Sequence, residues 1–193
     1  MRKASGHLPH CAPRIIALTG FMAVGKSTVG RALASHLQWP VIDLDSEIER
    51  RSKLRIHEIF ATRGESRFRE LESDALRHAM EHSGPVVIAL GGGTFVQPSN
   101  AALLRDHGAH VIFLEVGVEE LLERCRAGER RSSHNPRPLA ADAEAFCALY
   151  YHRLPYYQKA DMTVSTAGKM PEEIAREIAA ALGLSASTSA GRS

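Results

Sequence analysis

The chain has few cysteines, no long apolar run and no strong excess of either charge. Its three cysteines, Cys11, Cys125 and Cys147, are far apart and odd in number, which fits reduced thiols better than a framework of disulfide bonds. The residues before position 14 lack the apolar stretch of a secretory signal, and no stretch in the chain is long enough for a membrane helix. We therefore expect a cytoplasmic protein with no membrane partner.

The charges are nearly balanced, with 24 Lys and Arg residues against 22 Asp and Glu residues in a chain of 193. A surface that binds nucleic acid without regard to sequence needs a marked excess of basic residues, so we expect no nucleic-acid partner. The 10 histidines show no spacing typical of metal ligands. With 44% hydrophobic residues, a chain of this length suits one domain with a substantial core, and we expect a monomer.

Short apolar segments alternate with segments of helical periodicity along the chain. The apolar segments predict strands at residues 14–19, 41–42, 85–90, 110–114 and 162–165. The periodic segments predict helices at residues 27–37, from Asp45 onward with Asp45 as the N-cap, and at 55–63, 65–82, 99–107, 118–126, 141–158 and 171–182, with a break at Gly64. Because the strands are apolar throughout rather than at alternate positions, they indicate a parallel sheet covered on both faces. The predicted fold class is α/β, a three-layer α/β/α sandwich with about five strands.

One domain is expected over residues 14–184, with no internal repeat and no interdomain linker. Residues 1–13 are expected to form a flexible N-terminal extension, and the Ser-, Ala- and Gly-rich residues 185–193 a disordered tail. Residues 127–140 are polar, rich in arginine and contain prolines, so they are predicted to form a loop. This loop is long enough to fold over a bound ligand as a lid.

A glycine-rich motif lies between the first predicted strand and the first predicted helix. Residues 20–27 read Gly-Phe-Met-Ala-Val-Gly-Lys-Ser and fit the pattern G-x-x-x-x-G-K-[ST], whose backbone N–H groups cradle phosphates. Lys26 supplies a positive charge for the β- and γ-phosphates, and the Ser27 hydroxyl is a ligand for Mg²⁺. A glycine-rich turn that merely joins strand to helix is the weaker alternative, so the motif predicts nucleotide binding.

Two aspartates follow the second predicted strand, where ligands collect in an open α/β sheet. Asp43 is a candidate to hold Mg²⁺ directly or through water, and Asp45 to accept a hydrogen bond from a substrate hydroxyl and act as its base. The alternative is that Asp45 only caps a helix and Asp43 is a solvated loop residue. An Asn-Lys-x-Asp stretch, which is typical of GTPases, is missing from the sequence.

Glycines and arginines supply the other candidates. Gly91, Gly92 and Gly93 end the third strand and leave backbone N–H groups open to a ligand, although a flexible turn would look the same. Arg67, Arg69 and Arg153 lie on helical segments, where each taken alone is more often a solvated side chain. Arg137 lies between two prolines inside the predicted lid, a position that suits an arginine that stabilises a transition state.

Taken together, these segments resemble the shikimate kinase family from about residue 15 to residue 182. The resemblance rests on the phosphate loop and on an ordered series of short motifs: Asp43-Leu-Asp45, Glu58-Ile-Phe, Gly64-Glu65, Phe68-Arg69-x-x-Glu72, Leu90-Gly-Gly-Gly93, Arg137-Pro-Leu139 and Arg153-x-Pro-x-Tyr157. Their order and spacing are jointly specific, whereas no single segment beyond the phosphate loop is diagnostic.

The resemblance implies a five-stranded parallel sheet in the order 2-3-1-4-5 and a set of ligand contacts. The implied ATP contacts are Ala23, Val24, Gly25, Lys26, Ser27, Thr28 and Arg137, with Mg²⁺ on Ser27 and, through water, Asp43. The implied shikimate contacts are Asp45 with the ring hydroxyls, Arg69 and Arg153 with the carboxylate, and the glycines 91–93. Two residues depart from the family pattern: Ala23 replaces a usual glycine, which is tolerable if its φ is negative, and Lys169 stands where an arginine often contacts the adenine side.

The resulting hypothesis is ATP-dependent phosphorylation of the 3-hydroxyl of shikimate, with Lys26, Asp43, Asp45 and Arg137 as the catalytic residues. One rival is a kinase of the same fold that acts on another small hydroxy acid such as gluconate. The other rival is a ligand-sensing module without catalysis, although retention of the phosphate-loop lysine and serine, both aspartates and Arg137 favours an enzyme.

Overall fold

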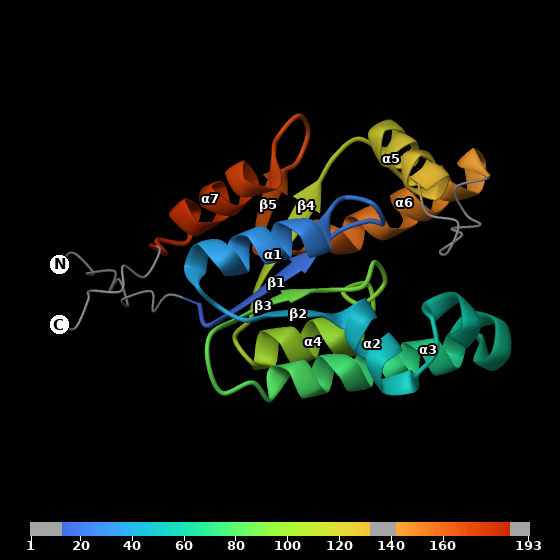
Figure 1. The fold of residues 1–193 in the computed structure, drawn as a ribbon, viewed down its shortest axis with the longest axis horizontal. Helices are drawn as coiled ribbons and strands as arrows, with labels where there is room; N and C mark the ends of the chain where they lie inside the picture. The colour runs from blue at the N-terminus through green and yellow to red at the C-terminus, as the bar shows by residue number, and fades with distance from the viewer. Residues whose placement is uncertain (1–12, 132–141, 186–193) are drawn as a thin grey trace, which may run out of the picture.

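The computed structural model describes residues 13–131 and 142–185, which form a five-stranded sheet between two layers of helices (Figure 1). The strands are β1 (Ile15–Thr19), β2 (Val41–Asp43), β3 (Val86–Ala89), β4 (His110–Glu115) and β5 (Met162–Ser165). Every neighbouring pair is parallel, and the order is β2-β3-β1-β4-β5. The predicted α/β fold class and strand order are confirmed.

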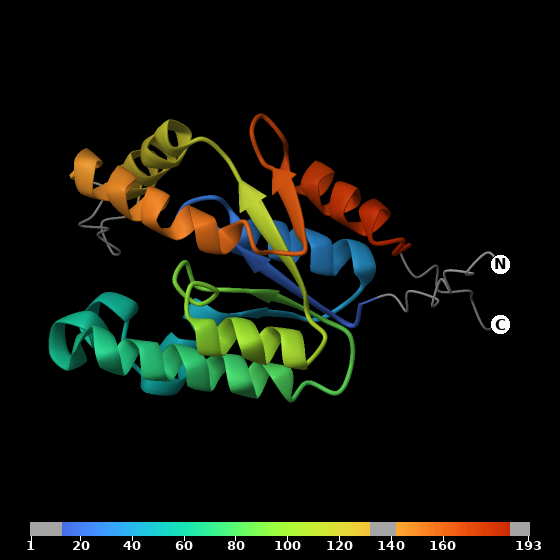
Figure 2. The ribbon, with the colours of Figure 1, turned by 180° about the vertical axis from the view of Figure 1, so that it is seen from behind.

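Seven helices cover the sheet within the described part of the chain. They are α1 (Lys26–Leu37), α2 (Leu44–Ser52), α3 (Ile56–Met80), α4 (Pro98–Asp106), α5 (Val118–Arg131), α6 (Ala143–Tyr157) and α7 (Pro171–Ala181). One face carries α1, α5, α6 and α7, and the other carries α2, α3 and α4 (Figure 1 and Figure 2).

Strand β3 and the first four residues of β1 are apolar because each face of the sheet has its own core. On β1, Ile16 and Leu18 point into the core beneath α1, whereas Ile15 and Ala17 point into the core beneath α3 and α4. A strand buried on both faces has no position at which a polar side chain reaches water. None of the described helices is long and apolar enough to cross a membrane.

Two local predictions in this part of the chain need correction or refinement. Gly64 has non-helical φ/ψ angles of 76° and 172°, so the predicted break is there, but the flanking helical segments run end to end as the single element α3. Helix α5 continues to Arg131, so the prediction that a loop begins at residue 127 was wrong; the alanine, glutamate and arginines there are good helix formers. The remainder of the predicted lid, residues 132–140 with Arg137, lies outside the described residues, as do the extension 1–12 and the tail 186–193.

The start of α2 differs from the prediction by two residues. Asp43 is the N-cap, and its Oδ1 accepts a hydrogen bond of 3.1 Å from the backbone N–H of Ser46. Asp45 therefore lies inside the first turn and not at the cap. The prediction failed because local preferences do not separate two aspartates that flank one leucine. As a consequence, the Asp45 carboxylate is left available for other contacts.

Candidate functional site

A cavity of about 1160 Å³ opens at the carboxyl ends of the central strands. It collects residues from the loop after β1, the start of α2, the turn after β3, helix α3 and helix α6. The predicted site residues that line it are Ala23, Gly25, Lys26, Ser27, Thr28, Asp43, Asp45, Arg69, Gly92, Gly93 and Arg153. Val24 and Gly91 are buried and do not line this cavity.

The loop between β1 and α1 has the geometry of a phosphate cradle. Gly20 has a φ of 141°, and a Cβ on it would lie 2.6 Å from the carbonyl oxygen of Leu114, so only glycine fits there. Gly25, with a φ of 101°, is the N-cap of α1, whose first turn holds no acidic residue. The positive end of the helix dipole therefore faces the loop. Lys26 Nζ lies over the loop and donates to the carbonyl oxygens of Gly20 (2.9 Å) and Phe21 (3.0 Å).

Ala23 adopts a left-handed conformation with a φ of 63°. The expectation of a negative φ at this position was therefore wrong. The loop needs a left-handed turn here, and the family's usual glycine would adopt it freely. For an alanine the same conformation costs on the order of 1 kcal/mol, because its Cβ crowds the following carbonyl oxygen. The phosphate loop of this chain is thus mildly strained.

The two aspartates after β2 have separate surroundings. Asp43 uses one carboxylate oxygen to cap α2 and still lines the cavity. Burial raises the pKa of Asp45 from 3.8 to about 6; the ammonium of Lys26 lowers it, and the carboxylates of Asp43 and Glu72 raise it further. A carboxylate whose pKa lies near the working pH can accept a proton from a hydroxyl and later release it.

An ion-paired cluster holds Arg69 in the cavity. Arg69 Nη1 lies 2.9 Å from Oε2 of Glu72, and Nη2 lies 3.0 Å from Oε1 of Glu65. The other oxygen of Glu72 accepts a hydrogen bond of 2.7 Å from the hydroxyl of Thr94. Glu72 and Thr94 are buried, so this arrangement fixes the guanidinium at one place.

Sequence reasoning gave Glu72 no role, although it belongs to the Phe68-Arg69-x-x-Glu72 motif. The available signal was its position three residues after Arg69 on a helix, on the face that also carries buried apolar residues. Its second partner, Thr94, is 22 residues further along the chain and could not be found from local spacing.

The three glycines after β3, Gly91, Gly92 and Gly93, differ in what surrounds them. A Cβ on Gly91 would lie 2.6 Å from Oε1 of Glu72, and a Cβ on Gly93 would collide with the guanidinium of Arg69. These two glycines therefore make room for the charged cluster. Gly92 lines the cavity, and its carbonyl oxygen accepts hydrogen bonds from two residues of α6.

Helix α6 supplies these two donors. The hydroxyl of Tyr157 donates to Gly92 at 2.5 Å, and Arg153 Nη1 donates to the same carbonyl at 3.3 Å. Tyr157 is fully buried, and this burial raises the pKa of its hydroxyl to about 12, so it remains a donor. Arg153 packs over the ring of Phe21 and lines the cavity.

Arg124 on α5 is a second residue that sequence reasoning missed. It donates to the carbonyl oxygens of Val24 (3.4 Å) and Thr166 (3.5 Å) and pairs with Glu120 at 2.6 Å. It therefore ties the phosphate loop to the turn after β5. Lys169, on that turn, forms an ion pair with Glu177 of α7.

The donor set beside the phosphate loop fits Mg²⁺. The hydroxyl of Ser27 and the carboxylate of Asp43 both line the cavity. Mg²⁺ prefers oxygen ligands and usually keeps several waters, so one carboxylate and one hydroxyl next to a nucleotide's phosphates suffice. No group of three or more His, Cys, Asp or Glu side chains suited to a metal occurs in the described ranges.

Comparison with known proteins gives consistent results. A family model described as shikimate kinase matches residues 22–183. A shikimate kinase of Geobacter sulfurreducens is 42% identical over 170 residues, which cover 86% of this chain and 89% of that protein. The structure of a shikimate kinase from Acinetobacter baumannii in complex with shikimate superposes with a TM-score of 0.76 at 32% identity, covering 89% of this chain and 93% of the other.

A more distant neighbour shares the fold. A gluconokinase from Sinorhizobium meliloti superposes with a TM-score of 0.58 at 22% identity, covering 89% of this chain and 93% of the other. At this identity the likeness concerns the architecture alone. With the family model spanning most of the sequence and a relative above 40% identity over most of both proteins, the chain belongs to the shikimate kinase family.

Proposed function

We propose that this protein transfers the γ-phosphate of ATP to the 3-hydroxyl of shikimate, giving shikimate 3-phosphate and ADP. The observation that carries the proposal is a cavity in which a phosphate loop faces a half-buried carboxylate and two arginines. The shikimate kinase homologues support the acceptor's identity.

The donor half of the reaction uses the loop and the start of α1. The backbone N–H groups of residues 23–28 bind the phosphate oxygens, and Lys26 exchanges its two loop carbonyls for the β- and γ-phosphates. Ser27 and Asp43 would hold Mg²⁺, which neutralises charge on these phosphates when bound. The protein's task in such a transfer is mainly alignment and charge neutralisation.

The acceptor half uses the other wall of the cavity. Arg69 and Arg153 bind the carboxylate of the acceptor, since a guanidinium grips a carboxylate through two parallel hydrogen bonds. Asp45 accepts a hydrogen bond from the reacting hydroxyl and takes its proton as the new O–P bond forms. Gly92 and Gly93 allow the small ring to approach the backbone.

Arg137, in the predicted lid, is the last of the proposed catalytic residues. Its guanidinium would neutralise charge on the transferred phosphoryl group in the closed state. The substitution Arg137→Ala should then lower kcat while leaving the KM for the acceptor nearly unchanged. An unchanged kcat would remove Arg137 from the mechanism.

The acceptor assignment is tested by replacing Arg69. Arg69→Ala should raise the KM for shikimate by roughly tenfold or more, because a bidentate charge-assisted contact is lost, and should leave ATP binding nearly unchanged. Arg63→Ala is the matched control, because Arg63 lies on the same helix, is exposed and does not line the cavity. Equal effects of the two substitutions on KM would contradict the proposed role of Arg69.

A further inference from the structure

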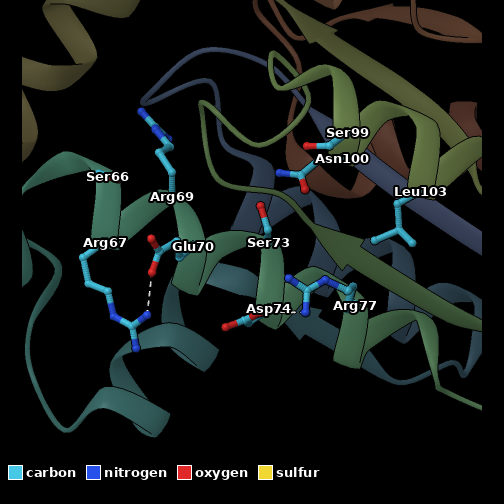
Figure 3. Close-up of a pocket in the computed structure, with 10 residues that line it drawn as sticks. All are labelled: Ser66, Arg67, Arg69, Glu70, Ser73, Asp74, Arg77, Ser99, Asn100 and Leu103. Carbon is cyan, nitrogen blue, oxygen red and sulfur yellow. Dashed lines mark hydrogen bonds and ion pairs between the residues drawn. The ribbon is translucent and has the colours of Figure 1, made fainter.

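A second, smaller cavity lies between helices α3 and α4 (Figure 3). It has a volume of about 600 Å³, and we call it the α3–α4 groove. Arg67, Ser73 and Arg77 of α3 and Ser99 and Asn100 of α4 line the groove, and Arg69 lines both this groove and the larger cavity. None of the first five residues lines the nucleotide and acceptor cavity.

Asn100 brings an unsatisfied donor to the groove. The residue is 2% exposed, and its Nδ2 has no hydrogen-bond partner among the residues that the structure describes. A buried amide without a partner is destabilising, so such a group calls for an acceptor. Figure 3 shows the Asn100 amide and the Ser73 hydroxyl pointing toward one another across the gap between the two helices.

The N-terminal end of α4 lies at the same place and adds donors. The first helical hydrogen bond runs from the N–H of Ala101 to the carbonyl of Gln97, so the N–H groups of Ser99 and Asn100 precede it. Gln97 caps the helix without a side-chain hydrogen bond, and the first turn holds no acidic residue. The positive end of this helix dipole is therefore not neutralised by its own sequence.

Two arginines lie on the α3 side of the groove. Arg67 pairs with Glu70 at 2.6 Å and Arg77 with Asp74 at 2.7 Å, both across one helical turn. These pairs are exposed to solvent, and exposed pairs contribute little to stability, so either guanidinium can turn toward another anion at small cost. The two carboxylates at the rim are compensated by their own arginines.

We propose that the α3–α4 groove is a second anion-binding site that takes the phosphate group of a small metabolite. Asn100 Nδ2, the N–H groups at the start of α4 and the hydroxyls of Ser73 and Ser99 donate to the phosphate oxygens, and Arg77 supplies charge. Several donors that converge from different directions suit a tetrahedral phosphate better than a planar carboxylate.

The groove is placed to affect the acceptor site. Helix α3 carries Ser73 and Arg77 in the groove, and it also carries Arg69, which lines the groove and whose guanidinium lies next to Gly93 in the turn after β3. A ligand that bridges α3 and α4 would restrain the helix that positions Arg69. The site is therefore suited to regulation by a phosphorylated metabolite.

The proposal is tested by NMR titration of the full chain, with the phosphate loop saturated by Mg²⁺ and ADP. Inorganic phosphate, added at constant ionic strength, should shift the backbone amide signals of Ser99 and Asn100 and the Asn100 side-chain NH₂ signals along a saturable curve. Acetate at equal concentration should shift them less. The apparent Kd for phosphate should lie in the millimolar range.

Variants separate this site from general charge effects. Arg77→Ala should weaken phosphate binding by roughly fivefold, whereas Arg105→Ala, which removes an exposed charge on α4 outside the groove, should leave it unchanged. Asn100→Asp should abolish the response if the variant folds, and Arg77→Ala keeps the test decisive if it does not. The proposal would be overturned if phosphate caused no saturable shifts, or if Arg77→Ala and Arg105→Ala weakened phosphate binding equally. The Asn100 amide would then have only water as a partner.

Discussion

Replacing Asp45 by asparagine should stabilise the protein in a way that depends on pH. In the folded chain the pKa of Asp45 is raised from 3.8 to about 6, chiefly by burial. At a pH above 6 the carboxylate must be ionised in a place that disfavours its charge, and asparagine removes this cost. At a pH below 3.8 the folded and unfolded chains both hold the proton, so the substitution gains nothing.

The size of the effect follows from the difference between the two pKa values. At 1.36 kcal/mol for each unit of pKa, a change from 3.8 to about 6 corresponds to about 3 kcal/mol. Because the cavity is open to water and Asp45 is only partly shielded from solvent, we expect about 1–2 kcal/mol. The wild-type protein should lose this amount of stability as the pH rises from about 4 to 7.

The assay is chemical denaturation of the nucleotide-free protein at several pH values between 4 and 8. The Asp45→Asn variant should match the wild type at the acid end and exceed it at the alkaline end. Asp106→Asn, an exposed aspartate at the end of α4, is the matched control and should show at most a small difference. A variant that is less stable than the wild type at pH 8, or a difference independent of pH, would refute the reasoning.

Three further outcomes follow from the site's geometry. Glu72→Gln keeps the shape but removes the charge that fixes Arg69, so steady-state kinetics should show the KM for shikimate raised by roughly tenfold; an unchanged KM would contradict the positioning role of Glu72. Ala23→Gly should raise the free energy of unfolding by up to about 1 kcal/mol, since it relieves a left-handed alanine, and a lower denaturation midpoint would argue against strain. Tyr157→Phe should lower the free energy of unfolding by about 1–2 kcal/mol in urea, because the buried bond to Gly92 is lost, and no change would mean that this bond contributes nothing.

The parts of the fold that depend on local pattern were predictable from the sequence. The five parallel strands follow from short apolar runs that alternate with helical segments, and the phosphate loop follows from glycines at fixed spacing. Both signals lie within a few neighbouring residues, which is why they survive without tertiary information.

The parts that depend on distant contacts or on fine geometry were not predictable. Glu72 acquires its role from Thr94 on the turn after β3, and Arg124 from carbonyls of Val24 and Thr166. The left-handed φ of Ala23 is imposed by the loop as a whole and opposes the preference of alanine. Local sequence patterns carry no information on such pairings.

The residues of the candidate site were predictable only in part. The structure brings Asp45, Arg69 and Arg153 into one cavity, although each alone had a plausible reading as a cap or a solvated side chain. Their roles in binding and catalysis stay predictions, as does the role of Arg137, which lies outside the described residues.

The central claim is most directly tested by ADP release from the purified protein with ATP, Mg²⁺ and either shikimate or gluconate. We expect turnover that depends on shikimate, with shikimate 3-phosphate as the phosphorylated product and little activity with gluconate. ATP binding without turnover of shikimate would contradict it; preferential turnover of gluconate would instead assign the cavity to another hydroxy acid.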